Sequence, residues 1–256
     1  MFDSFFWIQA LIVLCSGIVH GVFGFGFPMI STPLFAIMMD LKKAVLYSLL
    51  PTIAVNFFSL KKDNSFSAIW SAYKLLISSV IVGSIVGTNI LVLFYSDYYK
   101  LVLSAVILLY LNKERLNLSI THSVAHHPHA MTVVIGFLSG IVGGIANIMI
   151  PVLLILILEL GLDKKRSIGV MSFCFITNKV LQVIIFGYHG SFNGQSMPYI
   201  LPFIVLAIIG FFIGSKIQDK IDEKLYKKLL NSVLWVLSLY LIASTFANEL
   251  KVLLYL

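Results

Sequence analysis

Long apolar runs separated by short polar segments dominate the chain. Six of the uninterrupted runs are long enough to cross, or nearly cross, the hydrocarbon core of a bilayer, which takes about 20 helical residues. These runs cover residues 44–60, 67–95, 98–112, 166–187, 195–215 and 224–247. We therefore expect six plain membrane helices, of which the third is short and the second is long enough to tilt.

Two further apolar stretches, residues 5–40 and 130–161, are interrupted near their middle. The first contains Gly24-Phe25-Gly26-Phe27-Pro28, and the second contains Gly143-Gly144-Ile145-Ala146-Asn147 followed by Pro151. Relative to Ala, Gly weakens a helix by about 1 kcal/mol and an interior Pro by about 3 kcal/mol. We therefore expect two half-helices with a bend in each stretch. A bend at membrane depth has to face protein or a water-filled cavity.

The composition indicates that the helices of this protein are surrounded by lipid. Apolar residues make up 59% of the chain and charged residues 11%, against about 45–50% and about 25% in soluble domains. The net charge of +7 comes mainly from loop Lys and Arg, so we expect a lipid bilayer and no nucleic acid as partner. The first residues carry Asp3 and no basic segment, and we expect them to be retained as a helix. The fold class is all-α, a polytopic transmembrane helical bundle.

The two halves of the chain carry the same landmarks in the same order. The matched pairs are Ser16–Val19 with Ser139–Val142, Thr52–Asn56 with Cys174–Asn178, Gly83–Gly87 with Gly210–Gly214, and Tyr99-Lys100 with Tyr226-Lys227. We interpret residues 1–112 and 130–256 as two transmembrane repeats joined by a cytoplasmic, His-containing linker at 113–129. Each repeat holds one broken or hairpin element and three spanning helices. In this register Asn56 lies opposite Asn178.

An odd net number of crossings in each half predicts that the two repeats have inverted topology, as in many secondary transporters. One side of the membrane then receives twelve basic residues: Lys61, Lys62, Lys113, Arg115, Lys164, Lys165, Arg166, Lys216, Lys220, Lys224, Lys227 and Lys228. The other side receives Lys42, Lys43, Lys100 and Lys251. The richer side should be cytoplasmic, so we expect both termini outside.

The breaks are the first candidate for chemistry. They contain Gly24, Gly26, Gly143 and Gly144. A half-helix that restarts after a break presents free N–H groups and the positive end of its dipole, which attract an anion. We expect Asn147 to be an N-cap, and Pro28 or Pro33 suits a first helical turn. The alternative is that glycines let helices pack closely, which we favour for the pairs at 83/87 and 210/214.

Lys179 is the second candidate, because it lies near the middle of the 166–187 run. A Lys there costs about 2.5–3.5 kcal/mol for membrane insertion, so it should face the protein interior or a cavity. No Asp or Glu lies deep in any apolar run, and an anionic substrate could supply the counter-ion. The alternative is a snorkelling or neutral buried Lys. Asn56 and Asn178 lie at the same level and could bind substrate or bond to each other.

His20 and Lys74 are two further ionisable groups in the apolar runs. His20 lies between Gly17 and Gly21 and could carry a proton, although we favour a packed histidine. Lys74 lies within about two turns of the cytoplasmic end of its helix, and we expect it to snorkel.

The linker histidines are a third candidate. His122, His126, His127 and His129 could bind a transition metal, which leaves a divalent metal-ion permease as an alternative function. No Cys or nearby acid completes a ligand shell, so we favour a solvated loop and expect no metal and no cofactor. The chain has no phosphate-binding loop, G-x-S-x-G or H-E-x-x-H motif, and we expect no enzyme activity.

The spacing around the breaks resembles a known family. The first break follows Gly17-x3-Gly21-x2-Gly24-x-Gly26-x6-Pro33, and the second follows Gly136-x3-Gly140-x2-Gly143-Gly144-x6-Pro151. This pattern, within residues 10–245, resembles the TauE/SafE family of sulfite and sulfonate exporters, also called the toluene-sulfonate uptake permease family. The resemblance implies two four-helix halves and a small sulfur-containing anion as substrate. The family usually has a glycine triplet before the Pro, where this chain has Gly26-Phe27-Pro28 and Ile145-Ala146-Asn147.

Together these features predict a secondary transporter or permease that moves a small anion across the cytoplasmic membrane, and the resemblance implies sulfite, a sulfonate or a related anion. The chain could form a homo-oligomer. We expect one binding site near the midplane built from Lys179, Asn178, Asn56, Asn147, Gly24, Gly26, Gly143, Gly144 and His20.

Overall fold

The regular elements in the described part of the chain are all helices. A computed structural model describes residues 4–63, 66–94, 98–112, 115, 126–192, 197–218 and 223–254, and this part of the chain forms ten helices. The six plain runs correspond to α3 (Leu41–Asp63), α4 (Phe66–Leu93), α5 (Tyr99–Asn112), α9 (Lys164–Tyr188), α10 (Met197–Ile217) and α11 (Glu223–Leu254). The all-α prediction is therefore confirmed, and each of the six plain runs forms a helix. Four of them, α3, α4, α9 and α10, are among the described helices long and apolar enough to span a membrane, whereas α5 and α11 are not.

The two interrupted stretches form helix pairs, as their Gly and Pro content predicts. The pairs are α1 (Ser4–Phe23) with α2 (Phe27–Met38), and α7 (Pro128–Ala146) with α8 (Ile150–Glu159). We call residues 24–26 the first break and residues 147–149 the second break. The expectation of half-helices is wrong for α1 and α7, because their 20 and 19 residues reach about 30 Å at 1.5 Å per residue. Of the four helices in these two pairs, only α2 and α8, with 12 and 10 residues, are too short to cross the hydrocarbon core.

Six of the described helices are long and apolar enough to span a membrane. Their spanning segments are Phe5–Phe23, Leu41–Leu60, Phe66–Leu93, Pro128–Ala146, Lys165–Tyr188 and Met197–Ile217. The protein is therefore a multi-pass membrane protein, in which α2, α5 and α8 are shorter apolar helices packed among longer ones.

Glycines let two pairs of helices approach closely. Gly17 and Gly21 of α1 meet Gly210 and Gly214 of α10, and a Cβ added at Gly17 would lie 2.6 Å from the backbone oxygen of Ala207. The crossing of α4 with α7 is built in the same way, from Gly83 and Gly87 against Gly140 and Gly144. The close-packing interpretation of the glycine pairs at 83/87 and 210/214 is confirmed.

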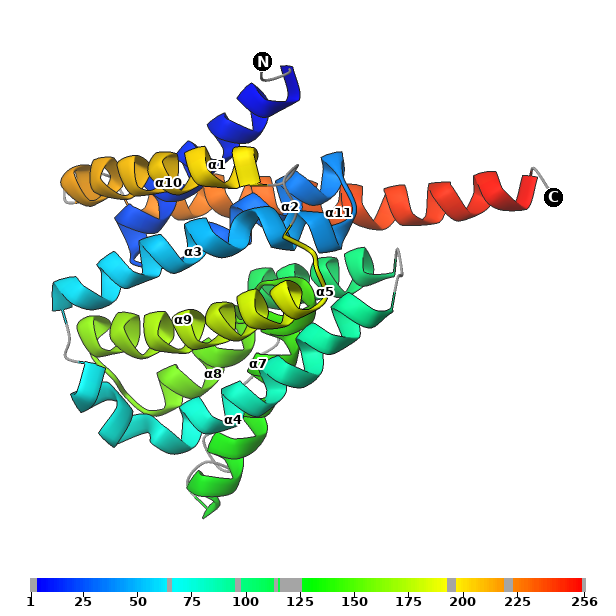
Figure 1. Cartoon of the computed structure of the whole chain (residues 1–256). Coiled ribbons are helices and arrows are strands. Elements are labelled where there is room, and N and C mark those ends of the chain that lie inside the picture. The colour runs from blue at the N-terminus through cyan, green and yellow to red at the C-terminus, as the bar shows by residue number, and fades with distance from the viewer. Residues whose placement is uncertain are drawn as a thin grey trace.

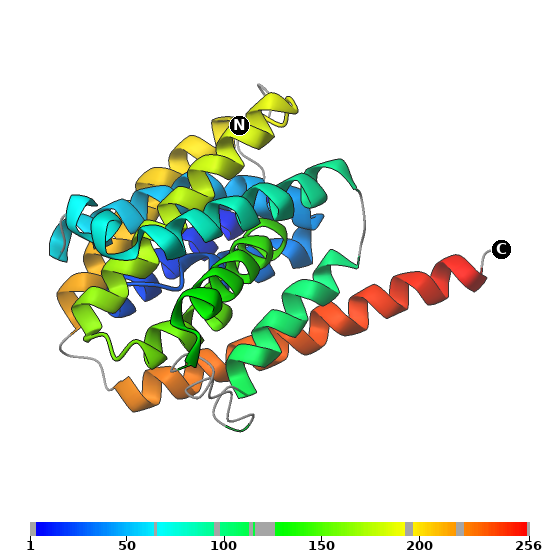
Figure 2. The same ribbon diagram turned by 90° about the horizontal axis from the view of Figure 1, so that it is seen from below.

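These crossings connect the two halves of the chain. The first helix of each half packs against a late helix of the other half, α1 on α10 and α7 on α4. Between these crossings α3 and α9 lie side by side in the middle of the bundle, and α5 lies against α11 (Figures 1 and 2). The C-terminal part of α11 extends beyond the other helices (Figure 2).

The close crossing of α1 with α10 predicts that Gly17→Ala destabilises the protein. The added Cβ would clash with the backbone of α10, so the two helices must move apart, and overpacking of this kind costs about 1–3 kcal/mol. We expect a lower midpoint of thermal unfolding in detergent. Gly187→Ala in α9 is the matched control, because a Cβ there would meet nothing within 4 Å. Equal midpoints for the two variants would contradict the close crossing.

Candidate functional site

The first break reverses the chain through two left-handed glycines. Gly24 has φ 79° and Gly26 has φ 108°, a region that residues with a Cβ rarely adopt. Gly26 is the N-cap of α2, and Pro28 lies in the first turn of that helix, as expected for its fixed φ. Pro33 lies inside α2 instead.

His20 fills the space beside this break. It is 1% exposed, and its Nδ1 accepts a hydrogen bond of 3.3 Å from the backbone N–H of Phe27. A neutral ring that accepts at Nδ1 carries its proton on Nε2, which lies 3.0 Å from the Oγ of Ser59 on α3 and can donate to it. His20 therefore satisfies one of the free N–H groups of α2, as in the packed-histidine interpretation.

The second break begins at Asn147, which has φ 63° and is the C-cap of α7. The prediction that Asn147 is an N-cap is therefore wrong, because α8 starts only at Ile150. Asn tolerates the left-handed region better than most residues, so it can end a helix as glycine does. Gly143 and Gly144 lie in the last turn of α7, just before the break and not within it.

The side chain of Asn147 connects the second break to the other half of the chain. Its Nδ2 donates hydrogen bonds to the Oγ1 of Thr32 on α2, at 2.7 Å, and to the Oγ of Ser48 on α3, at 2.6 Å. Its Oδ1 is buried and has no hydrogen-bond partner. An unpaired buried acceptor is rare and costs about 1–3 kcal/mol, so this oxygen is available to a ligand.

Lys179 is fully buried on α9, with 0% exposure. Its Nζ donates to Asn178 Oδ1 at 2.6 Å, to the backbone oxygen of Gly143 at 3.4 Å, and to Gln182 Oε1. Gln182 Nε2 in turn donates to the backbone oxygen of Gly144 at 2.9 Å. Three acceptors surround Nζ and all three are uncharged, so no carboxylate among the described residues is bonded to Lys179.

The two asparagines that sequence analysis places at one level have different partners. Asn178 Nδ2 donates to the Oγ of Ser84 on α4 at 2.7 Å. Asn56 on α3 bonds only within its own helix, to the backbone oxygen of Thr52 at 2.9 Å. Its Oδ1 is buried without a partner. Among the described hydrogen bonds, neither amide nitrogen donates to the other asparagine, so the alternative of a direct bond between them is not supported.

The two breaks lie at different heights along α3. Asn147 bonds to Ser48 and His20 to Ser59, and these positions are eleven residues apart (59 − 48), or about 16 Å along a helix. The predicted single midplane site is therefore divided. A first-break cluster contains His20, Gly24, Gly26 and Ser59, with Asn56 one turn away on α3. A second-break cluster contains Gly143, Gly144, Asn147, Asn178, Lys179 and Gln182.

Sequence analysis missed the neutral polar partners of both clusters. They are Thr32, Ser48, Ser59, Ser84 and Gln182, all of them buried. A usable signal was present, since polar side chains in an apolar run should face the protein interior, and Gln182 follows Lys179 by three residues, on the same helix face.

The linker histidines are only partly described. His126, His127 and His129 are exposed, and His122 lies outside the described residues. Within the part of the chain that the structure describes, no three His, Cys, Asp or Glu side chains gather where they could hold a metal ion.

Comparison with known proteins identifies a family. A family model described as sulfite exporter TauE/SafE matches residues 9–241, which is most of the chain. No curated protein matches, and no solved structure matches.

The second break makes a prediction for Asn147. Asn147→Gly keeps the left-handed backbone and loses the two hydrogen bonds, whereas Asn147→Ala also adds about 1–2 kcal/mol of backbone strain. We expect thermal stability to fall from wild type to the Gly variant to the Ala variant. Asn89→Ala is the control, because Asn89 bonds only to Ile85 in its own helix. An Ala variant as stable as the Gly variant would argue against a left-handed cap.

Proposed function

Because the chain belongs to the sulfite exporter TauE/SafE family, we propose that it is a secondary transporter for a small anion, specifically sulfite, a sulfonate or a related sulfur-containing anion. The family is one of membrane transporters and not of enzymes, and the six spanning helices agree with it. The proposal adds the substrate, the binding site and the orientation in the membrane.

The buried charge of Lys179 carries the proposal. The ammonium lies at the C-terminal end of α7, where it donates a hydrogen bond to the backbone oxygen of Gly143. The dipole of a helix supplies about −0.5 elementary charge at that end, so about half of the positive charge of Lys179 remains unbalanced. A small anion that enters the second-break cluster supplies the missing charge in a medium where attraction is strong.

The surrounding groups suit an oxyanion. Lys179, Asn178 and Gln182 all carry N–H donors and lie beside one another. Sulfite and sulfonate oxygens accept hydrogen bonds and carry negative charge, so they can replace the amide oxygens that now accept from Nζ. Charge-assisted bonds of this kind are about twice as strong as neutral ones.

A stripe of buried polar side chains on α3 offers a path between the two breaks. It consists of Ser48, Thr52, Asn56 and Ser59, and we call it the α3 polar stripe. It runs from the contact of Asn147 to the contact of His20 and lies on a helix packed against α9, which carries Lys179. Polar residues in membrane helices commonly mark substrate pathways, so we assign the anion's route to the α3–α9 contact.

Inverted repeats, residues 1–112 and 130–256, are part of the proposal. An offset of 123 pairs Gly24 with Asn147 (147 − 24), both left-handed, and pairs the helix starts at Leu41 and Lys164 (164 − 41). The same offset pairs Asn56 with Lys179 (179 − 56), one residue from the register expected from sequence. The reciprocal contacts of α1 with α10 and of α7 with α4 support a two-fold relation.

The proposed orientation has both termini outside the cytoplasm. It follows from twelve basic residues on one side against four on the other and from the positive-inside rule. In this orientation α1 and α2 form a hairpin entered from outside, and α7 and α8 form one entered from the cytoplasm. The two breaks then reach toward opposite membrane surfaces, which suits alternating access.

Transport in proteoliposomes tests the function. We expect sulfite flux through Lys179→Met to fall about 10- to 100-fold, because a hydrogen bond to a charged group contributes about 1.5–3 kcal/mol. Lys216→Gln, at the exposed end of α10, should keep the wild-type flux. Wild-type protein that moves neither sulfite nor sulfonates would refute the substrate class, and equal flux in Lys179→Met would remove Lys179 from the site.

Binding separates a lost site from a misfolded variant. Sulfite should raise the midpoint of thermal unfolding of the wild type but not of Lys179→Met, while chloride should raise neither. Asn56→Leu, on the α3 polar stripe, should bind sulfite as the wild type does and transport it more slowly. Unchanged flux in this variant would exclude the stripe as the path.

Cysteine labelling tests the orientation. In a background with Cys15 and Cys174 replaced by Ser, a membrane-impermeant thiol reagent added to intact cells should label Lys43→Cys and His189→Cys. Both positions are exposed and lie on the proposed outer side. Lys216→Cys should react only after the membrane is opened, and the reverse pattern would overturn the orientation.

A further inference from the structure

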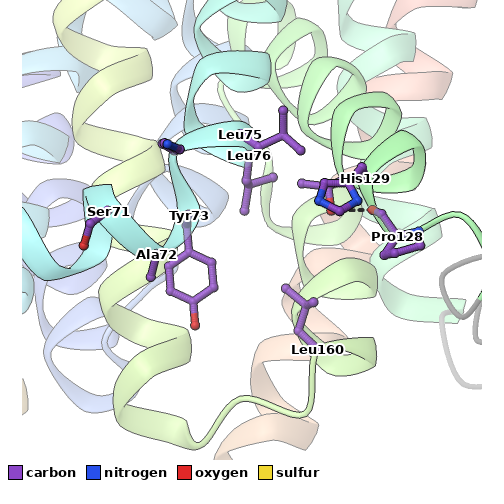
Figure 3. Close-up of a pocket in the computed structure, with 10 residues that line it drawn as sticks. Ser71, Ala72, Tyr73, Leu75, Leu76, Pro128, His129 and Leu160 are labelled. Carbon is purple, nitrogen blue, oxygen red and sulfur yellow. Dashed lines mark hydrogen bonds between the residues drawn. The ribbon is translucent and has the colours of Figure 1, made fainter.

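A pocket of about 480 Å³ lies away from both breaks, between α4, the start of α7 and the end of α8. Tyr73 and Ala72 lie on one side of it, and Pro128, His129 and Leu160 lie on the other (Figure 3). The remaining lining residues are Ser71, Lys74, Leu75, Leu76 and Thr132. The volume is in the range of small-molecule sites, and the lining combines apolar side chains with basic ones.

A break in the geometry of α4 forms one wall of this pocket. Tyr73 has φ −124° and ψ 22°, outside the helical region. Kinks in helices usually have a Pro or Gly nearby, but residues 66–82 contain neither. The bend lies directly beside the pocket.

The kink divides α4 so that the part after it has about the length of the hydrocarbon core. The helix has 28 residues, whereas about 20 are needed to cross, and 20 residues counted back from Leu93 end at Lys74. The preceding turns carry Phe66 and Trp70, which are 42% and 44% exposed, and both rings lie against Phe173. Trp is enriched at the membrane–water interface, so Trp70 supports a position of the pocket at the level of the lipid headgroups.

The charge of the pocket is positive. Lys74 and His129 are both exposed to it, and none of the described lining residues is acidic. The first turn of α7 also lies at the pocket, and its N-cap residue His127 makes no capping hydrogen bond with its side chain. The positive end of the α7 dipole therefore adds to the attraction for an anion.

We propose that this pocket binds the headgroup of an anionic phospholipid. The phosphate lies between Lys74, His129 and the first turn of α7, and the acyl chains follow Leu75 and Leu160, which are 38% exposed each. Basic pockets between membrane helices at a headgroup layer are known to take such lipids. The bound lipid connects the bend of α4 to α7, two helices that already cross at glycines. This inference does not depend on the transported substrate.

Native mass spectrometry of the purified protein with added phosphatidylglycerol tests the proposal. Removing a basic residue near an anionic lipid should lower its affinity about fivefold. We expect Lys74→Gln and His129→Gln each to reduce retention, and the double variant to reduce it most. Ala72→Trp should also reduce retention, because the indole fills the pocket without changing its charge. Lys216→Gln should retain phosphatidylglycerol as the wild type does.

Two comparison ligands decide the source of the phosphate. Phosphatidylcholine, which has no net charge, should be retained weakly and equally by all variants. Inorganic phosphate alone should not raise the thermal midpoint of the wild type. Equal phosphatidylglycerol retention by the wild type and the double variant would overturn the site. Stabilisation by inorganic phosphate alone would overturn its assignment to a lipid.

Discussion

Backbone groups that are freed where a membrane helix breaks must find hydrogen-bond partners inside the protein, because lipid offers none. This constraint explains the buried polar side chains that contact the two breaks. At the first break His20 accepts from the N–H of Phe27 and is held by Ser59. At the second break Lys179 and Gln182 donate to the carbonyls of Gly143 and Gly144. The breaks are therefore stable because buried side chains on α1 and α9 form hydrogen bonds with the freed backbone groups.

The glycine crossings bring those partners within reach. A Cβ at Gly140 would lie 2.7 Å from the backbone nitrogen of Ser84, so α7 can touch α4 only without side chains there. The close approach lets Ser84 bond to Asn178 on α9, and the reciprocal crossing of α1 with α10 brings Ser215 to the carbonyl of Gly21 at 3.4 Å. Close helix packing and the hydrogen bonds of the buried polar side chains thus depend on the same small residues.

The two breaks are satisfied by groups of different charge, and this difference gives the transporter its proposed polarity. A neutral His20 completes the first break, whereas a lysine completes the second. Under the proposed two-fold relation Asn56 takes the position of Lys179, so the positive charge is present in one half only. An anion is attracted more strongly to the break that carries Lys179 than to the neutral break at His20. We therefore expect the anion to bind at the second-break cluster.

Sequence alone determined the class of protein, the helices and the two interruptions, because hydrophobic length and Gly or Pro content act locally. It also identified Lys179, since a charge in an apolar run needs a partner wherever it lies. Only the tertiary structure decided what those residues contact. Asn147 is a C-cap that reaches Thr32 and Ser48, 115 and 99 residues away, and the breaks occupy different heights along α3. Such contacts depend on how the helices cross, which no local pattern encodes.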